Sequence, residues 1–266
     1  RALTTYEYDN YGGDANHAAL VVRPGIIALD DAYEPPNSIT ARGNRTGTFR
    51  WLSTTGGSVA TYVQFDVAGN ACKAIDGRGF QTSYQYNDNF GPPNGSVLDN
   101  SPPVELGNEF SYAFPTSITN AKGHVANTQF EYYLGRPVDY QDPNGITGSI
   151  SYDDSLDRPV ELIRAYGQPS KRGTRFVYDD APPHPRVHTY SDRAAFNDPD
   201  PLHSDVDFDS LGRESSRMVF ESAGTETDFI VTAVTEYDAA GRVKYRLNPF
   251  RVVNGLPSET QYRTQT

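Results

Sequence analysis

A short motif recurs along most of this 266-residue chain: an aromatic residue, an acidic residue and, a few positions later, Gly followed by Arg. The clearest copies are Phe208-Asp209-Ser210-Leu211-Gly212-Arg213 and Tyr237-Asp238-Ala239-Ala240-Gly241-Arg242. A second motif, such as Asp76-Gly77-Arg78-Gly79, begins ten residues before the aromatic residue of the next repeat, here Tyr86. Two motifs at a fixed distance are harder to obtain by chance than either alone. The chain is therefore interpreted as a tandem repeat.

The clear and the looser copies together define the residues that we assign to the structural repeat motif. They are Tyr8, Asp9, Phe65, Asp66, Gly69, Asp76, Gly79, Tyr86, Phe130, Gly135, Arg136, Asp142, Gly145, Tyr152, Asp153, Arg158, Tyr178, Asp179, Phe208, Asp209, Gly212, Arg213, Tyr237, Asp238, Gly241 and Arg242.

Between the motifs, apolar and polar residues alternate, as in Val243-Lys244-Tyr245-Arg246-Leu247. Such alternation is typical of half-buried β-strands. In Asp142-Pro143-Asn144-Gly145, Pro presets φ, Asp can bond the backbone two residues on, and Gly accepts a left-handed conformation, so this motif favours a tight turn. The aromatic motif makes the other turn of each unit. The sequence thus predicts an all-β fold of tandem antiparallel β-hairpins.

The repeat content divides the chain into three predicted regions. Residues 1–60 form a degenerate repeat region with inserted loops, residues 61–250 the hairpin array, and residues 251–266 a C-terminal strand or extension. The best helical candidates are short, from Asp14 to Leu20 and from Arg213 to Ala223. The loops at Pro35–Gly47, and at Pro92–Gly95 with Asp99–Gly107, are the first candidates for a binding surface.

The motifs resemble the YD repeats of the Rhs and teneurin class of large secreted or surface proteins. The resemblance rests on Tyr152-Asp153 through Arg158, on the two clear aromatic copies and on the turn at 142–145, and it covers roughly residues 60 to 250. In style the copies are similar to those of long Rhs-repeat proteins of environmental bacteria. In that family, hairpins join into a ribbon that spirals into a hollow shell, often around a toxin. The resemblance implies an elongated or spiralling sheet, part of a shell-like or fibre-like solenoid, and a piece of a longer protein.

Charge and composition limit which classes of partner the chain can bind and what its core is made of. The net charge of −11 argues against binding to nucleic acid or to anionic membranes, since both would repel the chain. No apolar run is long enough to span a membrane. Apolar residues are only 36% of the chain while aromatic residues reach 12%, so the core should be built from ladders of rings.

Few residues suggest a catalytic, metal-binding or cofactor-binding role. Asp205, Asp207 and Asp209 would share one strand face and are weak candidates for a metal site, although a solvated edge is the main interpretation of this run. The five histidines show no metal-ligand spacing, and no catalytic or cofactor-binding motif occurs. The single Cys72 is interpreted as a buried thiol, with an intermolecular bridge or a reactive thiol as alternatives. We therefore expect no cofactor.

These observations favour a non-enzymatic structural module, extracellular or at the cell surface, that serves as shell, scaffold or self-assembling filament material. The alternatives are a surface that binds glycans or proteins and a wall segment of a toxin-encapsulating Rhs shell. The self-cleaving protease of some Rhs shells is a further alternative, but its motifs are absent from the sequence. The expected partners are other copies of the chain or the remainder of a longer parent chain, with a glycan or protein ligand as a further option.

Overall fold

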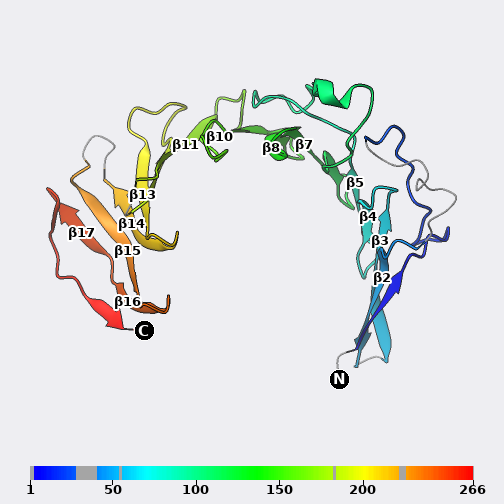
Figure 1. Cartoon of the computed structure of the whole chain (residues 1–266), viewed down its shortest axis with the longest axis horizontal. Coiled ribbons are helices and arrows are strands. Elements are labelled where there is room, and N and C mark those ends of the chain that lie inside the picture. The colour runs from blue at the N-terminus through cyan, green and yellow to red at the C-terminus, as the bar shows by residue number, and fades with distance from the viewer. Residues whose placement is uncertain (1–2, 28–40, 54–55, 182–183, 222–225, 266) are drawn as a thin grey trace. The chain divides into compact units, whose positions relative to one another are not determined.

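The computed structural model describes residues 3–27, 41–53, 56–181, 184–221 and 226–265. These residues are almost entirely β, with 19 strands and antiparallel pairing between all paired strands, which confirms the predicted fold class. The chain divides into two compact units, Arg1–Thr147 and Gly148–Thr266, and strand β9 (Thr147–Ser151) begins at the boundary. Figure 1 draws the strands of both units, coloured along the chain from blue at the N-terminus to red at the C-terminus. Among the described residues, no helix is long and apolar enough to cross a membrane.

The first unit is a ladder in which each strand pairs with the next one in sequence from β1 to β8. Its strands are β1 (Thr4–Tyr8), β2 (Arg45–Leu52), β3 (Gly57–Phe65), β4 (Ala71–Ile75), β5 (Gln81–Gln85), β6 (Ser117–Thr119), β7 (Val125–Glu131) and β8 (Arg136–Gln141). The loop between β5 and β6 contains a short 3-10 helix, η2 (Val104–Leu106).

The long loops of the first unit pack onto its strands. Single parallel bridges join Val21 to Asp66, Ile26 to Phe110 and Phe90 to Phe130. A buried cluster of Phe90, Leu106 and Phe130 lies under the β5–β6 loop, with partly buried Ile27, Phe114 and Tyr132 against it. This cluster is therefore largely aromatic, as the composition predicted, whereas the other buried hydrophobic residues of the unit are mainly aliphatic.

The second unit also pairs sequence neighbours, from β9 to β16, while β17 and β19 fold back onto β15 and β16. Its strands are β9 (Thr147–Ser151), β10 (Glu161–Arg164), β11 (Arg172–Asp179), β12 (Arg186–Ser191), β13 (Leu202–Phe208), β14 (Glu214–Phe220), β15 (Phe229–Tyr237), β16 (Val243–Leu247), β17 (Phe250–Val253), β18 (Leu256–Pro257) and β19 (Arg263–Gln265). Its core contains Met218, Phe220, Val231, Phe250 and Val252.

Both helical candidates are wrong. Residues 213–221 contain strand β14, in which Met218 and Phe220 are buried and Arg217 and Val219 are exposed, so the period is two residues and not 3.6. Residues 14–16 form a bend and residues 17–20 have no regular structure, because the Asp14 carboxylate accepts the backbone N–H groups of Asn16 and His17 and so favours a turn over a helix. Residues 28–40 and 222–225, which include parts of the expected loop and of the second helical candidate, lie outside the described residues. The division at residues 60 and 250 rests on motif content and stays a prediction.

Candidate functional site

Six turns share one local geometry. Each begins at an Asp or Asn, namely Asp66, Asp76, Asn120, Asp142, Asp209 or Asp238. In the last turn the N–H of Gly241 donates to the Asp238 carbonyl at 2.9 Å, and the Asp238 N–H donates to the Arg242 carbonyl at 2.8 Å. The Asp238 carboxylate also accepts the N–H groups of Ala240 and Arg242, both at 2.9 Å. The two sequence motifs, which are predicted to make the two turns of each unit, therefore share one turn geometry.

The fourth residue of each of these turns is a Gly in the left-handed region. The six φ angles lie between 74° and 87°, at Gly69, Gly79, Gly123, Gly145, Gly212 and Gly241. A Cβ at Gly145 would meet no atom within 4 Å, so the requirement for Gly there is conformational and not steric crowding. A left-handed residue at this place closes a three-residue hairpin loop.

The turn carboxylates are held in their ionised form. Hydrogen bonds from backbone N–H groups lower the pKa of Asp76, Asp142 and Asp238. For Asp209, a hydrogen bond from the Arg213 side chain is the first cause of its lowered pKa, followed by the backbone N–H of the same residue. These side chains use their oxygen atoms to fix the backbone, which is a structural role.

The copies that begin with an aromatic residue contain a β-bulge, which the turn at Asp76 lacks. The ladder shifts register immediately before the aromatic residue in the copies at Phe65, Phe130, Phe208 and Tyr237. At the Asp76 turn the pairing of β4 with β5 runs on without a shift. The aromatic residue thus marks a bend in the strand, which re-aims the side chains on that side of the motif.

One copy places the motif residues differently from the prediction. In the copy at Tyr152, Asp154 and not Asp153 binds Arg158, with Nε and Oδ2 2.5 Å apart, while Asp153 is exposed. Asp157 takes the position of the turn Gly, at φ 56°. The loop contains one residue more than the clear copies, so the carboxylate that faces the Arg is displaced by one position.

In the two remaining copies, the acidic residues Asp9 and Asp179 accept hydrogen bonds outside a tight turn of the shared kind. Asp9 accepts N–H groups of Gly43 and Asn44 at 2.8 and 2.9 Å, and so ties the end of β1 to the segment before β2. Asp179 accepts the N–H of Ala181 at 3.0 Å, and its neighbour Asp180 pairs with Arg158. Neither Asp closes a tight turn of the shared kind.

Arginine and tyrosine residues link consecutive copies in the second unit. The Arg158 guanidinium lies 3.9 Å from the centre of the Tyr178 ring, and that of Arg213 lies 4.0 Å from the Tyr237 ring. The Tyr178 hydroxyl donates to the carbonyl of Pro159 at 2.7 Å, as the Tyr237 hydroxyl does to Glu214 at 3.0 Å. Each Arg also binds the carboxylate of its own turn. We call this arrangement the arginine–tyrosine link.

In the first unit an inserted loop supplies the arginine of such a link. Arg23 lies 5.1 Å from the Tyr112 ring, and the Tyr112 hydroxyl donates to the carbonyl of Pro24 at 3.1 Å. The same guanidinium binds Asp66 at 2.9 Å, in a copy where Asn70 stands in place of the motif Arg. This replacement could not be predicted from the motif pattern, since Arg23 is 43 residues from Asp66.

Cys72 lies beside this pair, and the Arg23 guanidinium donates to its Sγ at 3.4 Å. Burial and the negative charge of Asp66 raise the pKa of the Cys72 thiol. A thiol that stays protonated is a weak nucleophile, which fits a structural role better than a reactive one.

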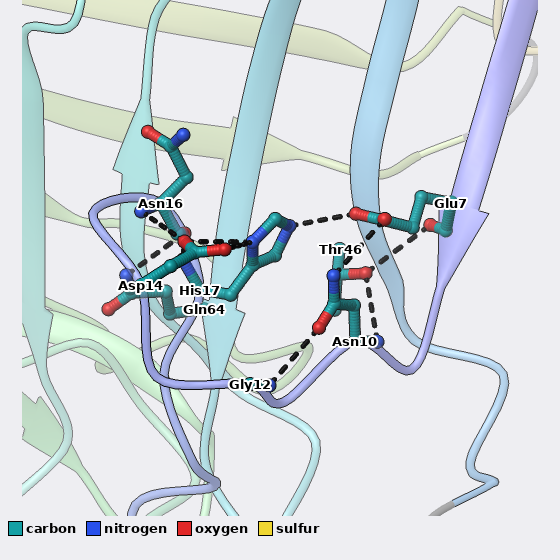
Figure 2. Close-up of polar contacts among 8 residues, drawn as sticks. All are labelled: Glu7, Asn10, Gly12, Asp14, Asn16, His17, Thr46 and Gln64. Carbon is teal, nitrogen blue, oxygen red and sulfur yellow. Dashed lines mark hydrogen bonds and ion pairs between the residues drawn. The ribbon is translucent and has the colours of Figure 1, made fainter.

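A histidine joins the first loop to β1 (Figure 2). Nε2 of His17 lies 2.7 Å from Glu7, and Nδ1 lies 2.9 Å from Asp14. Burial disfavours the charged ring, but the hydrogen bonds to Asp14 and Glu7 outweigh it and raise the pKa of His17. The bond to His17, with backbone N–H groups, lowers the pKa of Asp14 to about 2. The two carboxylates lie on opposite edges of the ring. The group is therefore suited to an ion-pair link between the first loop and β1, and not to a metal site. We call it the His17 ion-pair link.

A second histidine group lies between β12 and β13. His188 Nδ1 and His203 Nε2 lie 2.9 and 2.7 Å from the same Oδ1 atom of Asp205. Asp205 and His203 are buried, and His188 is partly exposed. The ring of His203 stacks between Tyr190 and Phe220, with centroids 4.4 and 4.0 Å away. Sequence spacing missed this group because the pairing of β12 with β13, not a local motif, brings the histidines together.

The three carboxylates proposed as weak metal candidates do not gather. Asp205 joins the histidines, and Asp207 binds Arg186 and the Ser216 hydroxyl. Asp209 lies beyond the bulge and closes the turn with Arg213. Within the described part of the chain, the group of His188, His203 and Asp205 is the one set of three such side chains placed to share a metal ion.

The predicted binding loop, Pro92–Gly95 with Asp99–Gly107, borders a hollow of about 510 Å³ in the first unit. Its lining is mainly proline and aromatic, with Phe90, Pro92, Pro103, Tyr132 and Tyr133 among it. A Cβ at position 91 would meet the Gln129 side chain at 2.5 Å, so only Gly lets the loop approach β7 this closely.

Two fully buried side chains hold that loop in place. Asp139 accepts the N–H groups of Asn94 and Gly95 at 3.1 and 2.8 Å. Gln129 accepts the Asp99 N–H at 3.1 Å and donates to the Pro92 carbonyl at 3.2 Å. The hollow therefore has a fixed wall.

No protein-family model and no curated protein sequence matches the chain. Among solved structures, the chain is similar to part of TcdB2-TccC3, with 16% identity and a TM-score of 0.52 over 77% of this chain and 12% of that one. It also matches part of a Tc holotoxin pore from Photorhabdus luminescens, with 12% identity and a TM-score of 0.43 over 83% of this chain and 11% of that one.

The likeness to TcdB2-TccC3 shows a shared all-β fold and supports an Rhs/YD-like architecture for this chain. The chain spans about an eighth of the length of the chain that it matches.

Proposed function

We propose that the chain is a non-catalytic structural module of the Rhs/YD-repeat type, a wall segment of a larger extracellular or cell-surface protein or assembly. The observation that carries the proposal is the single turn geometry that recurs from Asp66 to Asp238. A catalytic group is normally unique within a chain, whereas these carboxylates repeat and bind their own backbone.

The aromatic residues support the same function. The Phe90 and Phe130 cluster and the row of Tyr190, His203 and Phe220 are ring stacks within the sheet cores. A module that recognised ligands through a ring face would expose such a stack. Buried rings serve to hold strands together.

The wall of a shell and the material of a filament both fit a sheet of sequential hairpins. The fold likeness to TcdB2-TccC3, a chain about eight times longer than the matched part, favours the shell. In this proposal the module encloses cargo together with further repeats. Its partners are the remainder of a longer parent chain or other copies.

The test is to isolate the native material with an antibody against this chain and to examine it by mass measurement and electron microscopy. We expect a β-rich particle or fibre much heavier than 29.3 kDa and found outside the cell. A free intracellular monomer of that mass, with an enzymatic activity that Asp238→Asn abolishes without loss of stability, would refute the proposal.

The hollow beside Pro92–Gly95 and Asp99–Gly107 supports a second function, the binding of a glycan or a partner protein. Tyr133 on its rim is 69% exposed and oriented by a hydrogen bond of 3.0 Å to Glu105. Exposed rings on a fixed wall suit recognition of apolar surfaces. An array of immobilised glycans and proteins is the probe. Tyr133→Ala should remove binding, whereas Phe80→Ala, which removes an exposed ring that does not line the hollow, should retain it.

A further inference from the structure

Strand pairing places three metal-binding side chains on one face of β12 and β13. His188 lies directly opposite Asp205, and His203 precedes Asp205 by two residues, so all three point to the same side of the sheet. Their ligand atoms lie within 4.8 Å of one another. Both ring nitrogens are directed at one oxygen of Asp205. The convergence is a property of the register and is independent of the repeat motif.

The charges around this group are not balanced. Arg186 lies 3.4 Å from Asp205 and 2.5 Å from Asp207. With both imidazoles neutral, two carboxylates face one guanidinium, and one negative charge is left over. Asp205 is 1% exposed, and a buried charge is costly unless a positive charge lies beside it. A metal ion bound at this group would balance the remaining negative charge.

We propose that His188, His203 and Asp205 bind Zn²⁺, with water as the remaining ligand. Two imidazole nitrogens and one carboxylate oxygen form a donor set that suits Zn²⁺ and not the oxygen-seeking Ca²⁺ or Mg²⁺. Ligand atoms about 2.0 Å from a tetrahedral ion lie about 3.3 Å apart. The contacts of 2.7 and 2.9 Å would need to open only slightly to admit the ion.

The surroundings orient the ligands. The stack between Tyr190 and Phe220 fixes the ring of His203, and Arg186 binds the second carboxylate oxygen of Asp205. Such outer contacts set ligand direction in metal sites. The His188 side chain is 23% exposed, which leaves a route for the ion and a place for water. The ion would clip β12 to β13 and stabilise the second unit.

The experiment is a calorimetric titration of the chelator-treated full chain with zinc chloride. We expect one ion per chain and a higher melting temperature with Zn²⁺, because an ion that binds only the folded chain stabilises it. Loss of an outer contact typically costs 10- to 100-fold in affinity. Loss of a ligand in His188→Asn or His203→Gln should therefore cost at least about tenfold. The matched control is His124→Asn, which removes an exposed histidine on a turn of the first unit.

Because His203 is buried, its replacement can disturb folding, so a second measurement uses the wild-type chain. Nitrogen-15 spectra of the rings should show Zn²⁺ shifting Nδ1 of His188 and Nε2 of His203, with His124 and His184 unchanged. The proposal is overturned if the wild-type chain shows no saturable binding, if the His188 variant binds as the wild type does, or if the two ring nitrogens do not shift.

Discussion

The length of the acidic side chain matches the length of the turn that it closes. An Asp or Asn can reach the backbone N–H groups two and four residues ahead, as at Asp142 with Asn144 and Ile146. In the copy at Phe130 the acid is Glu131, and the Gly135 N–H donates to the carbonyl four residues back, so that turn is longer by one residue. The longer side chain serves the longer loop, where it binds the Leu134 N–H.

Replacement of the turn glycine should therefore cost stability through the backbone alone. Gly145→Ala places a Cβ on a residue at φ 78° with no nearby atom, so we expect a loss of about 1 kcal/mol in the free energy of unfolding. Urea denaturation measures it. Gly145→Asn should cost less because Asn tolerates this conformation. Gly13→Ala, without positive φ and in open space, is the control that should change little, and equal effects at both sites would contradict the explanation.

The His17 ion-pair link, formed by His17 with Glu7 and Asp14, predicts a pH dependence of stability. The folded-state pKa of His17 is raised above 6.5, so its contribution is full below 6.5 and is lost as pH rises through the higher folded value. The pKa of Asp14 is lowered to about 2, so its contribution is lost only when pH falls toward that value. We expect the wild type to lose stability between mildly acidic and alkaline pH, and His17→Gln to show a flatter curve.

Thermal melts across this pH range measure the difference between the two proteins. Glu7→Gln should flatten the curve in part, since one of the two carboxylates remains. His124→Gln, on an exposed turn, should leave the curve as it is. If the wild type and His17→Gln lost stability in parallel, His17 would not be the titrating group.

Between elements, the arginine–tyrosine link should stabilise neighbouring copies cooperatively. Arg213 binds Asp209 and lies over the Tyr237 ring, so its removal affects both strands that it joins. A double-mutant cycle with Arg213→Met and Tyr237→Leu should give a coupling free energy of about 0.5–1 kcal/mol. Tyr237→Phe keeps the ring and removes only the hydrogen bond to Glu214, so it separates the two parts of the link.

Arg242 provides the matched control for this cycle. It pairs with Asp238 in the same kind of turn, but its side chain is 80% exposed, and none of the described rings lies over it. Arg242→Met combined with Tyr237→Leu should show no coupling. A coupling as large as that of Arg213 would mean that the guanidinium acts through its own turn and not through the ring.

The sequence predicted the local elements well because their causes are local. The Asp and Gly of each turn lie within four residues, and alternation along a strand needs no partner, so the turns at 76, 142, 209 and 238 were predictable. The arginine–tyrosine links and the group at His188, His203 and Asp205 depend on strand register, which the sequence alone does not give. The helical candidate at Arg213 was wrong because its polar residues Ser215 and Ser216 obscured the alternation that follows.

At the scale of the whole chain, the strands pair mainly with their neighbours in sequence within two compact units. In such arrays each repeat contacts only those beside it, so stability is a sum of local terms. The turn and link variants should therefore act near their own copies. Contacts with other chains should instead form at the outer strands of the described ladders, because each outer strand pairs with a neighbour on one side only.

The outer strands β1 and β19 predict self-association of the chain. Among the described residues, β1 pairs only with β2 and β19 only with β16, and both strands are almost wholly exposed. Unpaired strand edges favour pairing with another chain. The net charge of −11 opposes this contact, so association should increase with salt, which screens the repulsion.

Sedimentation velocity over a concentration series, at low and high salt, measures this association. Thr4→Lys and Thr264→Lys place a charge on each outer strand and should reduce it, because a lysine on an edge disfavours edge-to-edge pairing. Ser155→Lys makes the same change of charge on an exposed loop and should leave association almost unchanged. Since a lysine also lowers the net negative charge, simple relief of repulsion would strengthen association in all three variants. Weaker association in the two strand variants alone would therefore identify the edges as the contact, whereas a wild-type chain that stays monomeric at every concentration and salt would show that these strands do not pair.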